Sequence, residues 1–200
     1  EYASLRDIFE ESVSKYASRP AFTCMGKSIT FTELDTLSAA FGAWLQGIGG
    51  GKGTRVALMM PNILQYPVCL FGTLRAGGTV VNVNPLYTAR ELEHQLADSG
   101  AEVIVVLENF ASTLAEVIAK TKVRHVVVTS MGELMGVKGL VVNFVVRRVK
   151  KMVKPWSIPN AIHVSDALAE GRRRTLARVP LTHDDIAFLQ YTGGTTGVAK

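Results

Sequence analysis

The sequence predicts an α/β fold, a mostly parallel sheet with helices on both of its faces. Short apolar runs alternate along the chain with segments in which apolar residues recur at helical spacing. The stretches between them are short and rich in turn residues, and five glycines fall between Gly47 and Gly53. Strands that alternate with helices favour a parallel sheet, because each parallel pair needs a crossover connection. The 200 residues, 48% of them hydrophobic, are enough to bury a substantial core.

Most of the predicted strands are continuous apolar runs, which is typical of buried parallel strands. The first two differ, because residues 25–27 form a turn signal between them and indicate a hairpin. The last strand leads into the final residues of the chain. In order, the expected strands cover residues 21–24, 28–31, 55–60, 79–83, 102–107, 123–129 and 186–191.

Three of the predicted helices begin at a hydroxyl residue followed three positions later by an acidic residue, the pattern of a capping box. These pairs are Ser4 with Asp7, Thr32 with Asp35, and Thr88 with Glu91. Helices are expected over residues 5–16, after Thr32, over 62–75, over 90–98 and after Asn109. Pro67 leaves two alternatives for the third helix, which either begins at Pro67 or has a kinked first turn there.

The last ten residues predict a phosphate-binding loop. They follow the apolar run at residues 186–189, so a strand runs out into a segment rich in glycine and threonine. Glycines let backbone N–H groups approach an anion closely, threonine hydroxyls add donors, and Lys200 adds a cation. The pattern is not the P-loop of kinases and GTPases, because Lys200 lies three residues past Gly197, and it is not the dinucleotide-binding glycine pattern. The alternative interpretation is a mobile polar turn.

This loop resembles the phosphate-binding signature of the acyl-adenylate-forming enzymes, commonly Tyr-Thr-Ser-Gly-Thr-Thr-Gly-x-Pro-Lys-Gly. Gly193 stands in the serine place and Ala199 in the proline place, and these departures resemble the bacterial long-chain fatty-acid–CoA ligases. Residues 59–68, 81–88 and 90–96 agree with that group as well, so the resemblance covers essentially the whole chain. It implies the N-terminal part of the acyl-adenylate-forming enzyme fold, in a family whose members continue well beyond the signature.

The resemblance also implies an ATP-dependent ligase that activates a long-chain fatty acid in two steps. The carboxylate attacks the α-phosphorus of ATP, giving acyl-AMP and pyrophosphate, and the thiolate of coenzyme A then displaces AMP. The loop and Mg²⁺ are expected to stabilise the departing pyrophosphate, with Lys200 as a phosphate ligand rather than a base. The residues assigned to ATP in this way are Tyr191, Thr192, Gly193, Gly194, Thr195, Thr196, Gly197 and Lys200.

No catalytic or metal-binding residue is predicted within these residues. In the family, the adenine pocket, the fatty-acid tunnel, the acidic metal ligand and the adenylation lysine lie further along the chain, so this part alone is expected to be inactive. Two other functions stay open. One is an aryl- or medium-chain acyl-CoA ligase, because the loop binds phosphate and not the acid. The other is a non-catalytic membrane-binding module.

Positive charge gathers in one segment of the chain. Six of the 22 basic residues fall between Leu134 and Ser165, where there is no Asp or Glu, and without them the chain has 16 basic and 17 acidic residues. A helix is predicted over residues 140–154, within a basic amphipathic segment at 138–156. Its apolar side would carry Val142, Val145, Val146, Val149, Met152 and Val153, and its basic side Arg147, Lys150, Lys151 and Lys154. Such a helix fits either an anionic membrane surface or packing on its own domain.

Two smaller groups of polar residues have alternative interpretations. Asn82, Asn84, Pro85 and Tyr87 lie at the end of a predicted strand, where α/β proteins place ligands, but a turn leading to the Thr88 cap explains them equally well. The four histidines and two cysteines have no metal-ligand spacing.

Composition and patterning also bear on partners and location. No apolar stretch is long enough for a transmembrane helix, and the absence of aromatic residues among the basic ones argues against nucleic-acid binding. We expect a cytoplasmic protein, peripheral at the inner face of the cell membrane, with a second copy of the chain among its candidate partners. The predicted domains are an α/β subdomain over residues 1–180 and the start of a second one, a strand plus the phosphate loop, over 181–200.

Overall fold

The computed structural model describes residues 2–191, and residues 1 and 192–200 lie outside the described part. The described residues form two compact units, each assembled from separate stretches of the chain. The first unit holds residues 2–54, 62–80 and 165–188, and the second holds residues 55–61, 81–164 and 189–191. The predicted domain boundary near residue 180 stays a prediction.

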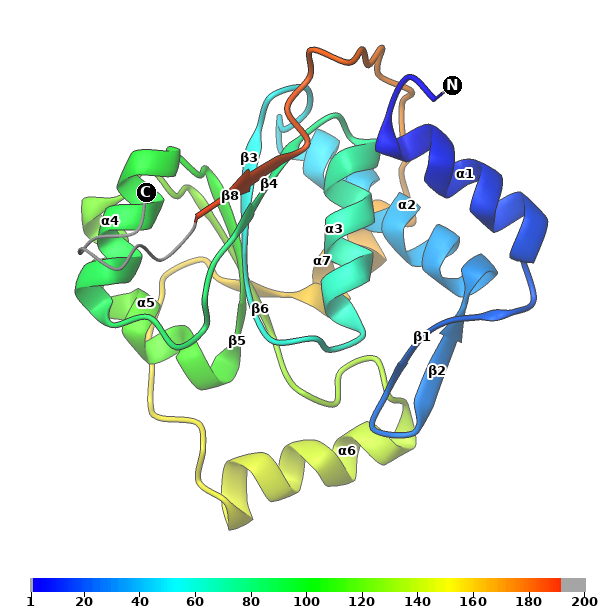
Figure 1. Cartoon of the computed structure of the whole chain (residues 1–200). Coiled ribbons are helices and arrows are strands. Elements are labelled where there is room, and N and C mark those ends of the chain that lie inside the picture. Colours follow the sequence, from blue (N-terminus) through cyan, green and yellow to red (C-terminus); the bar gives the residue numbers. More distant parts are fainter. Residues whose placement is uncertain (1, 192–200) are drawn as a thin grey trace. The chain divides into compact units, whose positions relative to one another are not determined.

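A six-stranded sheet runs in the order β7-β6-β5-β3-β4-β8 (Figure 1). Its strands are β3 (Arg55–Met59), β4 (Thr79–Asn82), β5 (Val103–Leu107), β6 (His125–Thr129), β7 (Ile162–His163) and β8 (Phe188–Gln190). The pairings β3–β5, β5–β6 and β6–β7 are parallel, which confirms the predicted kind of sheet. All five residues of β5 are buried, as expected of a strand covered on both faces.

The second unit buries alternate residues of these strands against two helices. The register pairs Ala57 with Ile104 and Ile104 with Val126, so these side chains share one face of the sheet. Leu92, Leu96 and Leu114 pack on that face. The helices of this unit are α4 (Ala89–Ser99), the 3₁₀ turn η1 (Glu108–Phe110), α5 (Ala111–Val117), the 3₁₀ turn η2 (Ile118–Lys120), α6 (Val137–Phe144) and the π-helical turn η3 (Val145–Val149).

The ends of α4 are those that the sequence predicts. Both hydrogen bonds of the capping box between Thr88 and Glu91 are present. Gly100 ends the helix with a φ of 63°, in the left-handed region that glycine adopts without steric cost. Local sequence signals therefore set both ends of this helix.

The first unit is held together by close helix–helix packing. A Cβ on Gly42 would lie 2.8 Å from the carbonyl oxygen of Gly72, and a Cβ on Gly171 would lie 1.8 Å from that of Ala40. Only glycine permits backbones to approach so closely. The elements of this unit are α1 (Leu5–Tyr16), the antiparallel hairpin of β1 (Pro20–Cys24) and β2 (Lys27–Thr30), α2 (Phe31–Gly47), α3 (Gln65–Arg75) and α7 (Val164–Gly171).

Two predicted helix starts are wrong. Thr30, and not Thr32, caps α2, and Glu33, and not Asp35, completes the capping box. Two overlapping patterns compete here, and Thr30 prevails because it already has the extended conformation that a capping residue needs. α3 begins at Gln65, so Pro67 lies inside the first turn, where a missing N–H costs no helical hydrogen bond. The short strand β7 and helix α7 had no counterpart in the prediction.

Candidate functional site

The candidate phosphate loop meets the described structure at Tyr191. Of the eight residues assigned to ATP from the sequence, Tyr191 is described, and residues 192–197 and 200 lie outside the described residues. The predicted strand before the loop is confirmed as β8, although it is shorter than expected.

Hydrogen bonds join β4 to β8 and to the two residues that precede β8. The N–H of Val80 donates to the carbonyl oxygen of Ala187 at 2.9 Å, and the hydroxyl of Thr79 donates to that of Ile186 at 2.8 Å. At the other end of β8, the side-chain amide of Asn82 donates to the side-chain oxygen of Gln190 at 2.8 Å. The strand thus enters the loop from a defined position on the sheet.

Tyr191 continues this attachment beyond the strand. Its ring packs against the hydrophobic core of the second unit, and its hydroxyl donates to the carboxylate of Asp98 on α4. Burial, followed by the hydrogen bond to Asp98, raises the pKa of Tyr191 to about 12. The hydroxyl therefore stays protonated and able to donate throughout the physiological range.

The sequence left two interpretations open for the residues at the end of β4, a ligand site and a turn, and the structure divides these residues between them. The side-chain oxygen of Asn84 accepts from the N–H of Leu86 at 3.0 Å, and its carbonyl oxygen accepts from the N–H of Tyr87 at 3.1 Å. Asn84 therefore organises a turn ahead of the Thr88 cap. Asn82 instead contacts Gln190, next to the start of the candidate loop.

A second polar cluster lies where β5 ends. Glu108 follows β5 directly, and its side chain is buried. The guanidinium of Arg147, from η3, donates to both carboxylate oxygens, with distances of 2.8 to 3.0 Å. These hydrogen bonds raise the pKa of Arg147 above its usual range. In the sheet, β4 lies on one side of β3 and β5 lies on the other, so the direction of the strand order reverses between β3 and β5. Ligands in α/β sheets usually bind at such a point. In this structure the guanidinium of Arg147 lies beside the Glu108 carboxylate.

The basic helix differs from the prediction in its bounds and in its orientation. It covers α6 and η3, from Val137 to Val149, rather than residues 140–154. Lys151 has a φ of 50°, which no helix contains, so Met152, Val153 and Lys154 lie beyond the helical end. The predicted apolar stripe through Met152 and Val153 is therefore wrong.

The side of this helix that packs on the rest of the second unit combines small, polar and apolar residues. Gly139 is buried, and Val142, Asn143 and Val146 are half-buried. The amide of Asn143 donates to the hydroxyl of Ser130, and its oxygen accepts from the N–H of Gly132, at 2.9 and 2.8 Å. Together with the ion pair between Arg147 and Glu108, these hydrogen bonds attach the helix to the rest of the unit through polar groups.

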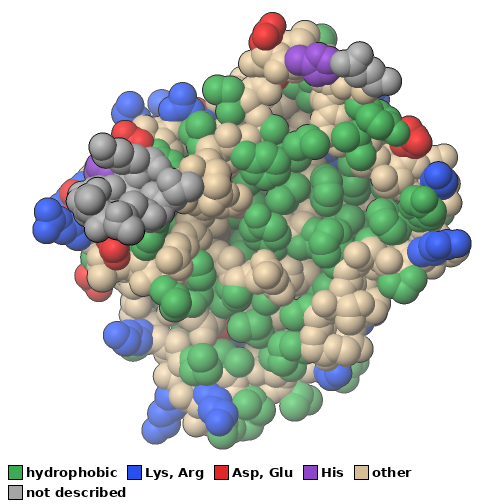
Figure 2. All heavy atoms as spheres, viewed as in Figure 1, with side chains coloured by type: hydrophobic (Ala, Val, Ile, Leu, Met, Phe, Trp, Pro, Cys, Tyr) green, Lys and Arg blue, Asp and Glu red, His purple; other side chains and the backbone are tan. Residues whose placement is uncertain are grey.

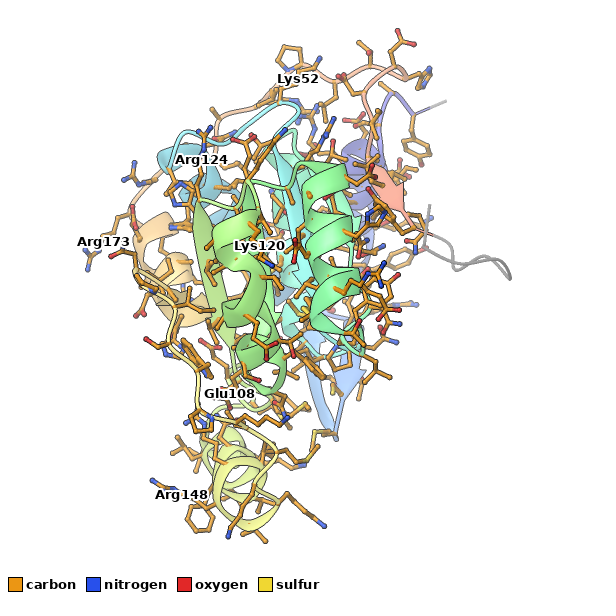
Figure 3. All side chains as sticks on the ribbon, turned by 90° about the vertical axis from the view of Figure 1, so that its left-hand side faces the viewer. Lys52, Glu108, Lys120, Arg124, Arg148 and Arg173 are labelled. Atoms are coloured by element: carbon orange, nitrogen blue, oxygen red, sulfur yellow. The ribbon has the colours of Figure 1, made fainter. Side chains whose placement is uncertain are left out.

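The opposite side of the helix exposes large apolar residues. Val137, Leu140, Val141 and Phe144 are 83%, 71%, 63% and 61% exposed. Positions i, i+3, i+4 and i+7 lie on one helical face, so these side chains form a single surface, the outward apolar face of α6. Figure 2 shows basic and hydrophobic side chains side by side in the region of α6, and Figure 3 shows Glu108 on the sheet side of α6 and Arg148 pointing away from it.

Other candidates contribute no site in the described part of the chain. An apolar groove of about 480 Å³ in the first unit has Ser12 as its only polar side chain, so it offers no charged group to a carboxylate or phosphate. Among residues 2–191, no three His, Cys, Asp or Glu side chains gather closely enough to hold a metal ion. No helix of this part is long and apolar enough to cross a bilayer.

Sequence reasoning missed Asp98, Gln190 and Glu108. Asp98 and Tyr191 are 93 residues apart, and Glu108 and Arg147 are 39 apart, so no short-range pattern links either pair. For Glu108 one signal was available, since an acidic residue directly after a buried parallel strand lies at the edge where ligand sites form. For Asp98 the sequence holds no comparable signal.

Comparison with known proteins gives consistent matches. The model of the AMP-binding enzyme family, described as "AMP-binding enzyme", matches residues 9–200. A long-chain-fatty-acid–CoA ligase of Escherichia coli O6:H1 is 59% identical over the whole chain, and one of Bacillus subtilis is 33% identical over 98% of it. The chain spans 36% and 35% of the length of these two relatives.

Solved structures agree on the fold. A long-chain-fatty-acid-CoA ligase from Archaeoglobus fulgidus superposes with a TM-score of 0.73 and 25% identity, over 98% of this chain and 36% of that one. An anthranilate CoA ligase in complex with anthranoyl-AMP superposes with a TM-score of 0.78 at 21% identity, over 99% of this chain and 34% of that one. The predicted fold, the N-terminal part of that of the acyl-adenylate-forming enzymes, is thereby confirmed.

Proposed function

Because the chain belongs to the AMP-binding enzyme family, we propose that the whole protein is an ATP-dependent long-chain fatty acid–CoA ligase. The observation that carries the proposal is the 59% identity to a protein of that name, which extends over the entire chain and includes the candidate phosphate loop. A strand that is hydrogen-bonded to the sheet leads into this loop, as a phosphate site with fixed donors requires.

In this proposal, the chain described here binds and orients the phosphates of ATP. N–H groups and hydroxyls of residues 192–197, with Lys200, stabilise the charge that develops on pyrophosphate as the fatty-acid carboxylate attacks the α-phosphorus. Tyr191 holds the start of the loop. In the second step, coenzyme A displaces AMP.

Mg²⁺ enters this proposal together with ATP. The resemblance places the acidic metal ligand of the family further along the chain, so this proposal assigns the protein ligands of the ion to other parts of the whole protein. When bound, the ion neutralises charge on the phosphate oxygens.

The test measures pyrophosphate release by the whole protein with ATP and fatty acids of graded chain length. We expect release to require both substrates and to be fastest with long chains. Lys200→Ala or Thr195→Ala should lower the adenylation rate by about two to four orders of magnitude, because each removes a donor that stabilises the transition state. Lys122→Ala, at an exposed position, is the matched control. Wild-type release from both loop variants would contradict the loop assignment, and a preference for benzoate or octanoate would favour an aryl- or medium-chain ligase.

A second proposed property is contact with an anionic membrane at the inner face of the cell membrane. The outward apolar face of α6 supports it, because four large apolar side chains are exposed and the exposed cations Arg148, Lys150, Lys151 and Lys154 follow them along the chain. Apolar side chains that enter the interface, flanked by cations near anionic headgroups, are the features of an interfacial helix. Arg147, which the sequence assigned to the membrane, is bonded to Glu108 within the protein. The proposal therefore assigns the membrane contact to Arg148 in its place.

Vesicle binding separates the two sides of the helix. Val141→Asp with Phe144→Asp should abolish binding to anionic vesicles and leave the melting temperature nearly unchanged. Val142→Asp with Val146→Asp, on the inward side, should instead destabilise the protein. Substitution of Arg148, Lys150, Lys151 and Lys154 by glutamine should weaken vesicle binding, and added salt should weaken the vesicle binding of the wild type.

Full vesicle binding by the outward-face variant, Val141→Asp with Phe144→Asp, would contradict the proposal. Self-association without vesicles, lost in that variant, would assign the face to a second copy of the chain, and vesicle binding without ligase turnover would favour a membrane-binding module.

A further inference from the structure

The side chain of Tyr191 is attached to α4 at the last described position before the candidate phosphate loop. Its hydroxyl donates to Asp98, and its partly buried ring packs against the core of the second unit. Because Thr192 follows directly in the sequence, any displacement of Tyr191 also displaces the first residue of the loop.

Asp98 occupies a position that does not favour α4. The carboxyl end of a helix carries partial negative charge, so an acidic residue in the last turn costs stability. No basic residue occupies that turn. Arg55 compensates in part, because its guanidinium donates to the carbonyl oxygen of Ser99. The helix itself therefore gives no reason for a carboxylate at position 98, whereas the hydroxyl of Tyr191 does.

A second set of hydrogen bonds also connects this face of α4 to the end of β8. Gln95 lies one turn before Asp98, is buried, and donates from its side-chain amide to the carbonyl oxygen of Asn82 at 2.8 Å. Asn82 in turn donates to the side chain of Gln190. Two consecutive residues, Gln190 and Tyr191, are thus connected to two positions of one helix, three residues apart.

We propose that Asp98 is a positioning residue for the phosphate loop: it holds the Tyr191 hydroxyl and thereby fixes where the loop begins. This inference rests on the proposed function of that loop. Donors stabilise a transition state only when they are already in place, and a displacement of about 1 Å can cost about a hundredfold in rate. Asp98 would act in this way without contact to ATP.

The test uses the whole protein and two measurements. In ATP–pyrophosphate exchange with palmitate, Asp98→Ala and Tyr191→Phe should each lower kcat by about ten- to a hundredfold, with little change in the KM for palmitate. The double variant should lose no more than the worse single variant, because both act through one bond. Asp98→Asn keeps an acceptor for the hydroxyl and should restore most of the activity.

The matched control is a second hydrogen bond between a tyrosine and a carboxylate in the described chain. The hydroxyl of Tyr2 donates to Glu11 at 2.6 Å, in the first unit. Tyr2→Phe and Glu11→Ala remove the same kind of bond and should leave kcat unchanged. Equal losses in these variants, additive losses in the double variant, or wild-type kcat in Asp98→Ala would each overturn the inference.

Binding of inorganic pyrophosphate, measured by calorimetry, separates this inference from the proposed ligase activity. If wild-type protein shows no exchange with any acid, the proposed function fails. The positioning role is then judged from the pyrophosphate Kd, which Asp98→Ala should raise by about tenfold or more while Glu11→Ala leaves it unchanged. An unchanged Kd in Asp98→Ala, or a wild-type Kd too weak to measure, would overturn the positioning role.

Discussion

The helices α4 and α6 belong to the same unit and place their large apolar side chains differently. α4 packs Leu92 and Leu96 in the core and leaves its charged residues outside. α6 packs Asn143 toward the protein and leaves Leu140 and Phe144 exposed. The comparison teaches that apolar spacing predicts the presence of a helix, whereas its orientation depends on what the adjoining structure offers to each face.

The structure beside α6 offers polar partners and little space. Glu108 supplies a buried carboxylate for Arg147, and Ser130 and Gly132 supply partners for Asn143. A Cβ on Gly139 would lie 1.8 Å from the carbonyl oxygen of Gly132, so this side of the helix approaches a backbone directly. A large apolar side chain would not fit there. Buried polar groups must be hydrogen-bonded, and that requirement outweighs apolar spacing at this helix.

The largest expected effect comes from the same substitution on the two helices. Leu96→Ala should lower the free energy of unfolding by about 2–5 kcal/mol, because it leaves a cavity in the core. Leu140→Ala removes an exposed side chain and should change it by no more than about 0.5 kcal/mol. Denaturant unfolding of both variants provides the measurement. Similar losses in the two would show that the outward face of α6 is covered in solution.

The next effect tests how α6 is attached. Glu108→Gln should cost about 1–2 kcal/mol, because a buried acceptor of a charged donor loses its charge, while the part-exposed Arg147 recovers some hydration. Glu102→Gln, at the other end of β5, is the matched control. Its carboxylate lies 3.8 Å from Arg124 and both side chains are exposed, so its loss should be within about 0.5 kcal/mol. If the two substitutions cost the same, the Glu108 pair does not hold α6.

Much of α4 and little of α6 could be predicted from the sequence. The capping box of Thr88 and Glu91 and the stop at Gly100 are contacts between near neighbours, so a short pattern contains them. The orientation of α6 depends on Glu108, which is 39 residues from Arg147. The strands were predictable for the same reason as α4, since continuous apolar runs indicate burial whatever covers them.

The candidate site divides in the same way. The composition of the loop and the strand before it are local and were predicted, and β8 is confirmed. The attachment of Tyr191 to Asp98 joins the strand exit to a helix 93 residues earlier, which only the folded sheet brings together. Short motifs therefore predict what a loop binds, and the tertiary structure shows how Tyr191, the residue before it, is attached.

A smaller effect concerns the capping residue that α4 has and α6 lacks. Thr88→Ala removes the hydroxyl that accepts from the N–H of Glu91 and should cost about 1 kcal/mol. α6 begins after Gly136, without a side-chain cap, so no equivalent substitution exists there. Thermal unfolding gives the measurement, and an unchanged melting temperature would mean that packing alone sets the start of α4.

The smallest effect is the pH dependence of that same cap. The carboxylate of Glu91 accepts from the N–H and the hydroxyl of Thr88 at 2.8 and 2.7 Å, and the backbone bond is the main reason that the pKa of Glu91 lies below its ordinary value of 4.5. A carboxyl with a lower pKa in the folded state binds fewer protons there than in the unfolded state. The charged carboxylate of Glu91 therefore adds its full contribution to the free energy of unfolding above pH 4.5, and this contribution is lost as the pH falls through the lowered pKa. Glu91→Gln should be less stable than wild type at neutral pH, and the difference in melting temperature should close below pH 4.5. As a control, Thr88→Ala keeps the backbone N–H and should retain most of this pH dependence. If the difference in melting temperature between Glu91→Gln and wild type stays constant on acidification, the capping bond does not depend on the charge of Glu91.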